Sequence, residues 1–247
     1  MNYSAAVREL ARQFAEAGFL VLDPLVPRAW AESAITLCEM HLARSDARRP
    51  GVRRVVEAEP GLGPLIARSK IPELVGAIVG PDARLVRSIL FDKSPEANWA
   101  VPWHQDAVIA VRERLDVPGF GPWSVKDGGP HCRPPREVLD SILVVRVHLD
   151  ACGPENGPLR LVPGSHRLGV LREAEVDEAA ARGPAVECCT GPGGAVLMRP
   201  HTVHASARSA ATSRRRVLHL EFSRTELPGG LRWAEGEGDL RTLPAHG

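Results

Sequence analysis

The segment Leu85-Val86-Arg87-Ser88-Ile89-Leu90-Phe91 decides the fold, because the chain changes there from helical to β patterning. Before it, apolar residues recur at helical spacing; after it, short apolar runs are separated by glycine and proline, as is typical of strands and turns. Helices followed by many short strands indicate an α+β protein with a mainly β core of the sandwich or jelly-roll type.

Working outward from this segment, the pattern predicts one domain over residues 1–247, with a helical part over about 1–80 and a β core over about 84–223. The expected helices are Ser4–Ala17, Arg28–Ala47, Leu62–Ser69 and Pro72–Val79, with a short strand at Phe19–Leu22 after the first. The strands expected after Phe91 are His104–Val111, Ile142–Leu149, Leu159–Val162, Val186–Cys189, Ala195–Met198, Val203–Ala207 and Val217–Phe222.

Composition excludes several classes of protein. A formal net charge of +1 and the lack of a basic stripe with interleaved aromatic residues argue against a nucleic-acid partner. No apolar run approaches the ~18 residues of a membrane-spanning helix, and Met1-Asn2-Tyr3-Ser4 does not begin a secretory signal. The five cysteines form no C-x-x-C pair, so a cytoplasmic protein is expected.

The run Trp103-His104-Gln105-Asp106 holds two metal-liganding side chains one residue apart. On an extended strand such residues point the same way, so His104 and Asp106 are predicted to be adjacent ligands of one ion. A third ligand would complete the two-histidine, one-carboxylate triad of non-haem Fe(II) oxygenases. His204 is the candidate and His201 its rival, while His166 ends a Pro-Gly-Ser-His turn and is expected to cap it.

Arg215 stands just ahead of the apolar strand Val217–Phe222. Its guanidinium offers paired, permanently charged donors that suit the distal carboxylate of a dicarboxylic acid. Strand alternation places the competing Arg214 and Arg216 on the opposite face.

At this point the chain resembles the phytanoyl-CoA dioxygenase family of Fe(II)/2-oxoglutarate oxygenases. The motifs that carry the resemblance are, in order, Trp103-His104-Gln105-Asp106, Glu155-Asn156-Gly157-Pro158-Leu159-Arg160, Val162-Pro163-Gly164-Ser165-His166-Arg167, His204-Ala205-Ser206 and Arg215. The resemblance implies a double-stranded β-helix (jelly roll) with N-terminal helices against it, iron held by His104, Asp106 and His204, and 2-oxoglutarate held by Arg215.

The resemblance also implies the reaction: with Fe(II), 2-oxoglutarate and O₂, a small-molecule substrate is hydroxylated, and succinate and CO₂ are released. The carboxylate of Asp106 separates the chain from halogenating relatives, which have a small residue there. Desaturation, epoxidation or ring closure by the same iron chemistry stay open as alternatives. So do a non-catalytic jelly-roll binding protein and a zinc hydrolase on the same ligands, although the zinc interpretation leaves Arg215 unexplained.

Further residues are candidates for the same cavity. Ser206, Arg146 and Gln105 are co-substrate candidates, and for Arg146 a substrate carboxylate or a structural acidic partner is an open alternative. Substrate candidates are Lys93, Trp123, Lys126, His131 and His148. The Gly- and Pro-rich segment Val117–Pro135 is expected to be a lid loop, with a fixed Ω-loop packed by Trp123 as the alternative.

Overall fold

Antiparallel sheets carry the fold of the computed structural model, which describes residues 3–44 and 51–236. A six-stranded sheet has the order β1-β11-β8-β13-β3-β2, a four-stranded sheet the order β10-β9-β12-β4, and a three-stranded sheet the order β5-β7-β6. The strands are β1 (Phe19–Leu22), β2 (Gly51–Arg53), β3 (Arg84–Lys93), β4 (Val101–His104), β5 (Ile109–Ala110), β6 (Trp123–Lys126), β7 (Gly129–Cys132), β8 (Leu143–His148), β9 (Leu159–Leu161), β10 (Val186–Cys188), β11 (Ala195–Met198), β12 (His204–Ser206) and β13 (Arg215–Ser223).

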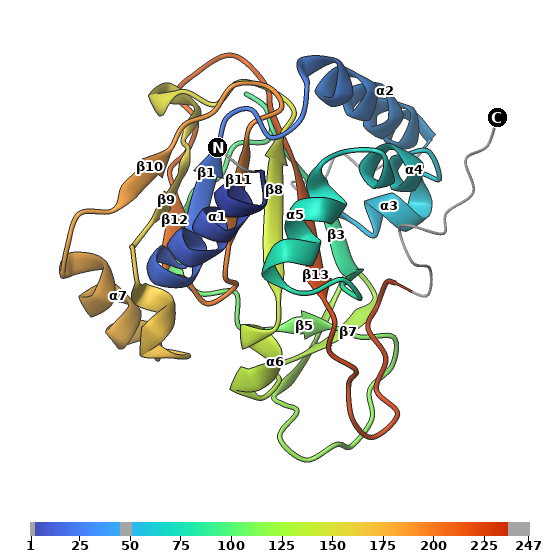
Figure 1. Ribbon diagram of the computed structural model, residues 1–247, viewed down its shortest axis with the longest axis vertical. Coiled ribbons are helices and arrows are strands. Elements are labelled where there is room, and N and C mark those ends of the chain that lie inside the picture. Colours follow the sequence, from blue (N-terminus) through green and yellow to red (C-terminus); the bar gives the residue numbers. More distant parts are fainter. Residues whose placement is uncertain (1–2, 45–50, 237–247) are drawn as a thin grey trace.

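Helices from the N-terminal part cover one face of the six-stranded sheet, with α1 and α5 drawn in front of it in Figure 1. The α-helices are α1 (Tyr3–Ala17), α2 (Arg28–Arg44), α3 (Val55–Ala58), α4 (Leu62–Ala67), α5 (Ile71–Ile78), α6 (Arg136–Asp140) and α7 (Glu173–Ala181). Two 3₁₀ turns, Pro154–Asn156 and Ser165–Leu168, flank β9.

Strand alternation divides the interior into two apolar cores. Leu90, Leu218 and Val145 point from the six-stranded sheet toward the helices, where they pack in one cluster with Phe14 and Ala34. The opposite face of the same strands packs against the four-stranded sheet, as Val144 and Val196 do against Leu159 and Leu161. This second face, enclosed between two sheets, is the jelly-roll interior, and the functional site lies at its edge.

The predicted fold class is confirmed by this arrangement. The predicted helices are present with small shifts at their ends, while positions 45–47 of the second one lie outside the described residues. Among the residues that are described, no helix is long and apolar enough to cross a membrane.

One predicted strand is wrong. A strand over His104–Val111 was expected, but β4 ends at His104 and β5 begins at Ile109. The chain leaves the ladder between them because Asp106 N–H donates to Pro200 O (2.9 Å) rather than to a neighbouring strand.

The expected loop Val117–Pro135 contains the hairpin β6–β7, which pairs further with β5. Its turn at Asp127-Gly128 places both residues at positive φ (49° and 76°). Asp-Gly favours this turn because both residues tolerate left-handed backbone, and its twist matches that of the two strands.

Candidate metal and co-substrate site

Two strands of the four-stranded sheet bring the histidines together. His104 ends β4 and His204 begins β12, and the two residues stand directly opposite each other in the antiparallel register. Their rings lie 4.1 Å apart between centroids. The third predicted ligand approaches from the loop after β4, with Asp106 Oδ1 3.8 Å from His104 Nε2 and Oδ2 3.6 Å from His204 Nε2.

The donor atoms fit a single metal ion. One donor atom from each of the three side chains lies within 4.8 Å of the other two. Donors that are each ~2.1 Å from one ion can be at most ~4.2 Å apart, and the separations of 3.8 and 3.6 Å between the two Asp106 oxygens and the histidine Nε2 atoms lie within that limit.

Hydrogen bonds orient both imidazoles for coordination. His104 Nδ1 donates to Pro102 O (2.9 Å) and His204 Nδ1 to Thr202 O (2.7 Å), so each Nε2 carries the free lone pair. Burial lowers the pKa of His204 to about 4, which keeps its ring neutral at pH 7. Burial alone would raise the pKa of Asp106, but His204 and His104 hold it well below its usual range.

A cavity of about 160 Å³ opens beside these donors, and three cations line it. Lys93 and Arg215 stand opposite each other on β3 and β13, and Arg146 comes from β8. The Nε atoms of both arginines are buried with no partner among the described residues. Burial, with the charges of Arg215 and Arg146, lowers the pKa of Lys93 to about 8. The cavity is therefore suited to an anion.

Arg215 is fixed from behind by the turn before β9. It is only 5% exposed, and its Nη1 donates to Gly157 O. Gly157 has left-handed backbone (φ 62°), and a Cβ there would collide with Ala207 O. The glycine thus allows this turn to pack closely against the backbone after β12, while its carbonyl oxygen accepts the hydrogen bond from Arg215.

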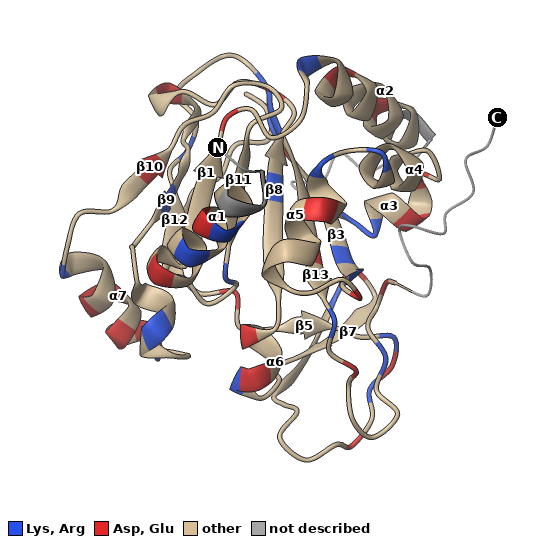
Figure 2. Ribbon diagram, in the orientation of Figure 1, with Lys and Arg blue, Asp and Glu red and all other residues tan. Residues whose placement is uncertain are grey.

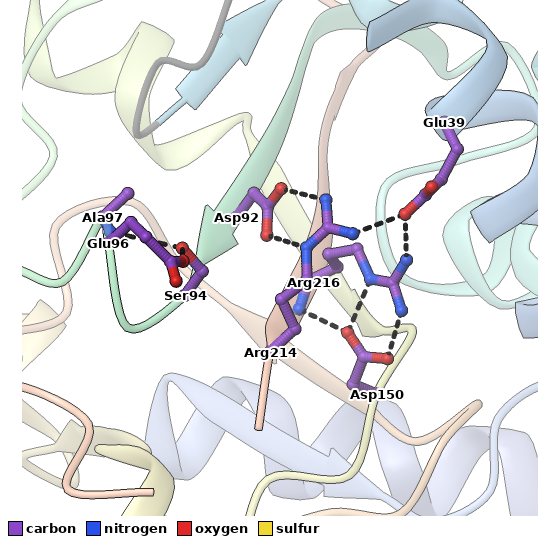
Figure 3. Close-up of polar contacts among 8 residues, drawn as sticks. All are labelled: Glu39, Asp92, Ser94, Glu96, Ala97, Asp150, Arg214 and Arg216. Atoms are coloured by element: carbon purple, nitrogen blue, oxygen red, sulfur yellow. Dashed lines mark hydrogen bonds and ion pairs between the residues drawn. The ribbon is translucent and has the colours of Figure 1, made fainter. Parts of the chain in front are cut away.

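The neighbouring arginines point the other way, as predicted. Figure 3 shows Arg214 and Arg216 directed toward carboxylates on the helix-covered side of the sheet. Arg214 forms two hydrogen bonds with Asp92 (3.1 and 2.6 Å), and Arg216 forms two with Asp150 (2.8 and 2.7 Å). Both also reach Glu39 on α2. Only Arg215 of the three lines the cavity.

Two other candidates also lie in or beside this cavity. Ser206 lines it, and its Oγ is 3.4 Å from Lys93 Nζ. His148 is buried, with neither ring nitrogen hydrogen-bonded among the described residues, but it is not part of the cavity lining. Burial, then Arg146 and Arg215, lower its pKa to about 3.

The prediction that Gln105 lies in the co-substrate cavity needs correction. Its amide N–H groups donate to Gly169 O (2.8 Å) and His201 O (2.7 Å), and its oxygen accepts from Leu171 N–H (2.7 Å). It faces away from the cavity because it lies between two residues that face into it. Its polar atoms therefore bind backbone groups, and Gln105 does not line the cavity.

The hairpin candidates do not line the metal cavity either. Trp123 packs against the core between the sheets, under the Arg114 guanidinium (5.6 Å from the ring centroid). Lys126 and His131 line a separate cavity. The two rival histidines have structural partners, since His201 Nε2 lies 3.1 Å from Asp140 and His166 Nε2 contacts Ala15 O.

The sequence analysis missed a buried polar chain on the inner face of the large sheet. Arg146 Nη1 donates to His219 Nδ1 (2.9 Å), His219 Nε2 donates to Glu221 Oε1 (3.0 Å), and Arg87 Nη1 donates to the same oxygen (2.9 Å). Charged residues inside the apolar runs at 85–91 and 217–222 were the available signal, because burying them unpaired is costly.

The family described as "Phytanoyl-CoA dioxygenase (PhyH)" matches residues 6–217. L-proline trans-4-hydroxylase of Streptomyces griseoviridis is 26% identical in an alignment of 184 residues that covers 63% of this chain and 61% of that relative's length. Ectoine dioxygenase of Stutzerimonas stutzeri is 24% identical, over 88% of this chain and 77% of the relative.

A solved structure shares the fold. The non-haem α-ketoglutarate-dependent carbocyclase SnoK from nogalamycin biosynthesis superposes with a TM-score of 0.68 at 18% identity, covering 87% of this chain and 83% of SnoK.

Proposed function

The chain belongs to the phytanoyl-CoA dioxygenase family of Fe(II)- and 2-oxoglutarate-dependent dioxygenases, and on that premise we propose that it hydroxylates a small-molecule substrate with release of succinate and CO₂. The observation that carries the proposal is the placing of His104, Asp106 and His204 at one side of a cavity whose other lining includes Lys93, Arg146 and Arg215. Metal donors and carboxylate-binding cations thus share one small space.

Each group of residues has its own task. His104, Asp106 and His204 would hold the Fe(II) ion through two imidazoles and one carboxylate. When bound, the iron supplies the oxidising chemistry that couples 2-oxoglutarate decarboxylation to oxidation of the substrate.

Arg215 binds the distal carboxylate of 2-oxoglutarate through its unpaired Nε and its fixed guanidinium plane. Lys93 and Arg146 add positive charge around the same anion, and Ser206 offers a hydroxyl. Burial strengthens these contacts, because water does not compete for the donors.

The test is succinate formation from 2-oxoglutarate by purified protein with Fe(II) and O₂, with and without a panel of small metabolites. We expect slow turnover without substrate and stimulated turnover with the right one, whose product gains one oxygen atom. A desaturated or cyclised product would show that the protein catalyses desaturation or ring closure instead of hydroxylation. If iron is bound but no 2-oxoglutarate is consumed under any condition, the chain is a binding protein rather than an enzyme.

A further inference from the structure

A second cavity, of about 240 Å³, lies at the other end of the inner face of β3. It is bounded by β2, β3, the segment after β5, the β6–β7 hairpin and the C-terminal segment around Glu235. Figure 2 shows Lys and Arg positions on the ribbon around β3 and β7, two of the elements whose residues line the cavity. At ~30 Å³ per water molecule, the space equals that of about eight waters and suits part of a small organic molecule.

Positive charge dominates the lining. Its cations are Arg53, Arg54, Arg87, Arg112 and Lys126, and its carboxylates are those of Asp127 and Glu235. Burial raises the pKa of Glu235 to about 7, so this group contributes less than a full negative charge at neutral pH.

Several donors of the lining are not used by the protein itself. Arg53 pairs through Nη1 with Asp127, and Arg87 through Nη1 with Glu221, yet the Nε of each arginine is buried without a partner among the described residues. Arg87 is 8% exposed and His131 2% exposed, and His131 Nε2 is likewise buried without a partner. Burial, then Arg87 and Arg53, lower the pKa of Lys126, as expected where cations crowd together.

Strand β3 contributes residues to the lining of both cavities. Arg87 lines the second cavity, while Phe91, on the same face of β3, lines the metal cavity. Arg87 and Phe91 are four positions apart on the strand, which corresponds to about 13 Å at ~3.3 Å per residue. The polar chain from Arg87 through Glu221 and His219 ends at Arg146, which also lines the metal cavity.

We propose that the second cavity binds an anionic group, a carboxylate or a phosphate ester, of the substrate that is oxidised at the metal site. This rests on the proposed function. The substrate is then an organic anion whose charged group lies on the order of 10 Å from the oxidised carbon. Lys126 and the free Nε atoms supply the attraction and the hydrogen bonds.

The experiment is calorimetric titration of the Fe(II) protein under anaerobic conditions with saturating 2-oxoglutarate, so that the metal cavity is already filled. Phenylacetate and phenyl phosphate are the anionic probes, and phenylacetamide is the neutral control. We expect at least one anion to bind and the amide not to. The stronger anion identifies the substrate's charged group.

Charge reversal at the cavity rim tests the location. Lys126→Glu should weaken binding of that anion by about tenfold or more, and Lys126→Arg should restore it. Lys70→Glu is the matched control, because Lys70 is an exposed lysine outside both cavities and should have no effect. Failure of both anions to bind, or binding that is indifferent to Lys126→Glu, overturns the inference.

Succinate formation in the same preparations tests the proposed function separately. A protein that consumes 2-oxoglutarate but ignores both anions refutes only the anion site. If the protein binds an anion at Lys126 but never consumes 2-oxoglutarate, the proposed function is refuted. The anion then cannot be part of a substrate that is oxidised at the metal site.

Discussion

Replacing Arg214, Arg215 and Arg216 by alanine, one at a time, should separate co-substrate binding from stability. Arg215 is buried beside the metal donors, whereas its neighbours bind carboxylates on the far side of the sheet. We therefore expect only Arg215→Ala to weaken 2-oxoglutarate binding strongly. The three substitutions remove the same side chain, so the two outer variants are controls for the inner one.

The expected size of each effect follows from how deeply the arginine is buried and from the partners that it loses. Loss of a desolvated charged partner costs about 2–5 kcal/mol, or on the order of 30-fold to several thousand-fold in affinity, for Arg215→Ala. The Arg216 side chain is 12% exposed and donates two hydrogen bonds to the Asp150 carboxylate. Its removal should lower the free energy of unfolding by about 1.5–3 kcal/mol. This corresponds to a decrease in Tm of about 3–12 °C. Arg214 is 37% exposed, so its effect should stay within about 1 kcal/mol.

The assay is anaerobic titration of 2-oxoglutarate into the Fe(II) protein, with thermal unfolding of each variant as the companion measurement. If Arg215→Ala fails to fold, Arg215→Lys keeps the charge but loses the paired donors, and should still show weakened binding. Equal 2-oxoglutarate affinity in the wild type and in a folded Arg215 variant would refute the assignment. A large binding defect in Arg214→Ala or Arg216→Ala would show that the inward-facing arginine has been misidentified.

Three further predictions concern other parts of the molecule. His204→Ala should abolish tight Fe(II) binding, measured by metal content after dialysis, whereas His201→Ala should retain iron; the reverse result would make His201 the ligand. Glu235 holds its proton more tightly when folded, with a pKa of about 7 against an ordinary value of 4.5, so its stabilising effect is full below pH 4.5 and is lost as pH rises through 7. Urea unfolding of Glu235→Gln should consequently vary less between pH 4.5 and 7 than that of the wild type, and an identical pH profile would count against this. Residues 117–135 should gain hydrogen-exchange protection when substrate binds; unchanged protection would favour a fixed loop packed by Trp123.

The pairing of His104 with Asp106 could be predicted from sequence because the two residues are close neighbours in the chain. His104 and Asp106 are one residue apart, and few side-chain pairs serve as ligands. The inward direction of Arg215 also followed from alternation, since the apolar run Val217–Phe222 fixes the face on which each residue lies.

What could not be predicted depends on contacts between distant segments. The end of β4 at His104 is set by Pro200, nearly a hundred positions away, which takes the Asp106 N–H. The β6–β7 hairpin has few apolar residues and so gives no strand pattern, although Asp127-Gly128 was a usable turn signal. The buried partners of Arg146 lie on β13, beyond any local pattern.

Gln105 has a consequence for how iron is acquired. Its side chain ties the ligand segment to Gly169, Leu171 and His201, three backbone groups from two other loops. Each ordered residue costs about 1–2 kcal/mol in lost backbone entropy, and here that loss occurs when the chain folds. Metal capture then needs little further ordering of the protein. Gln105, which faces away from the metal donors, therefore helps to hold His104 and Asp106 in place before a metal ion binds.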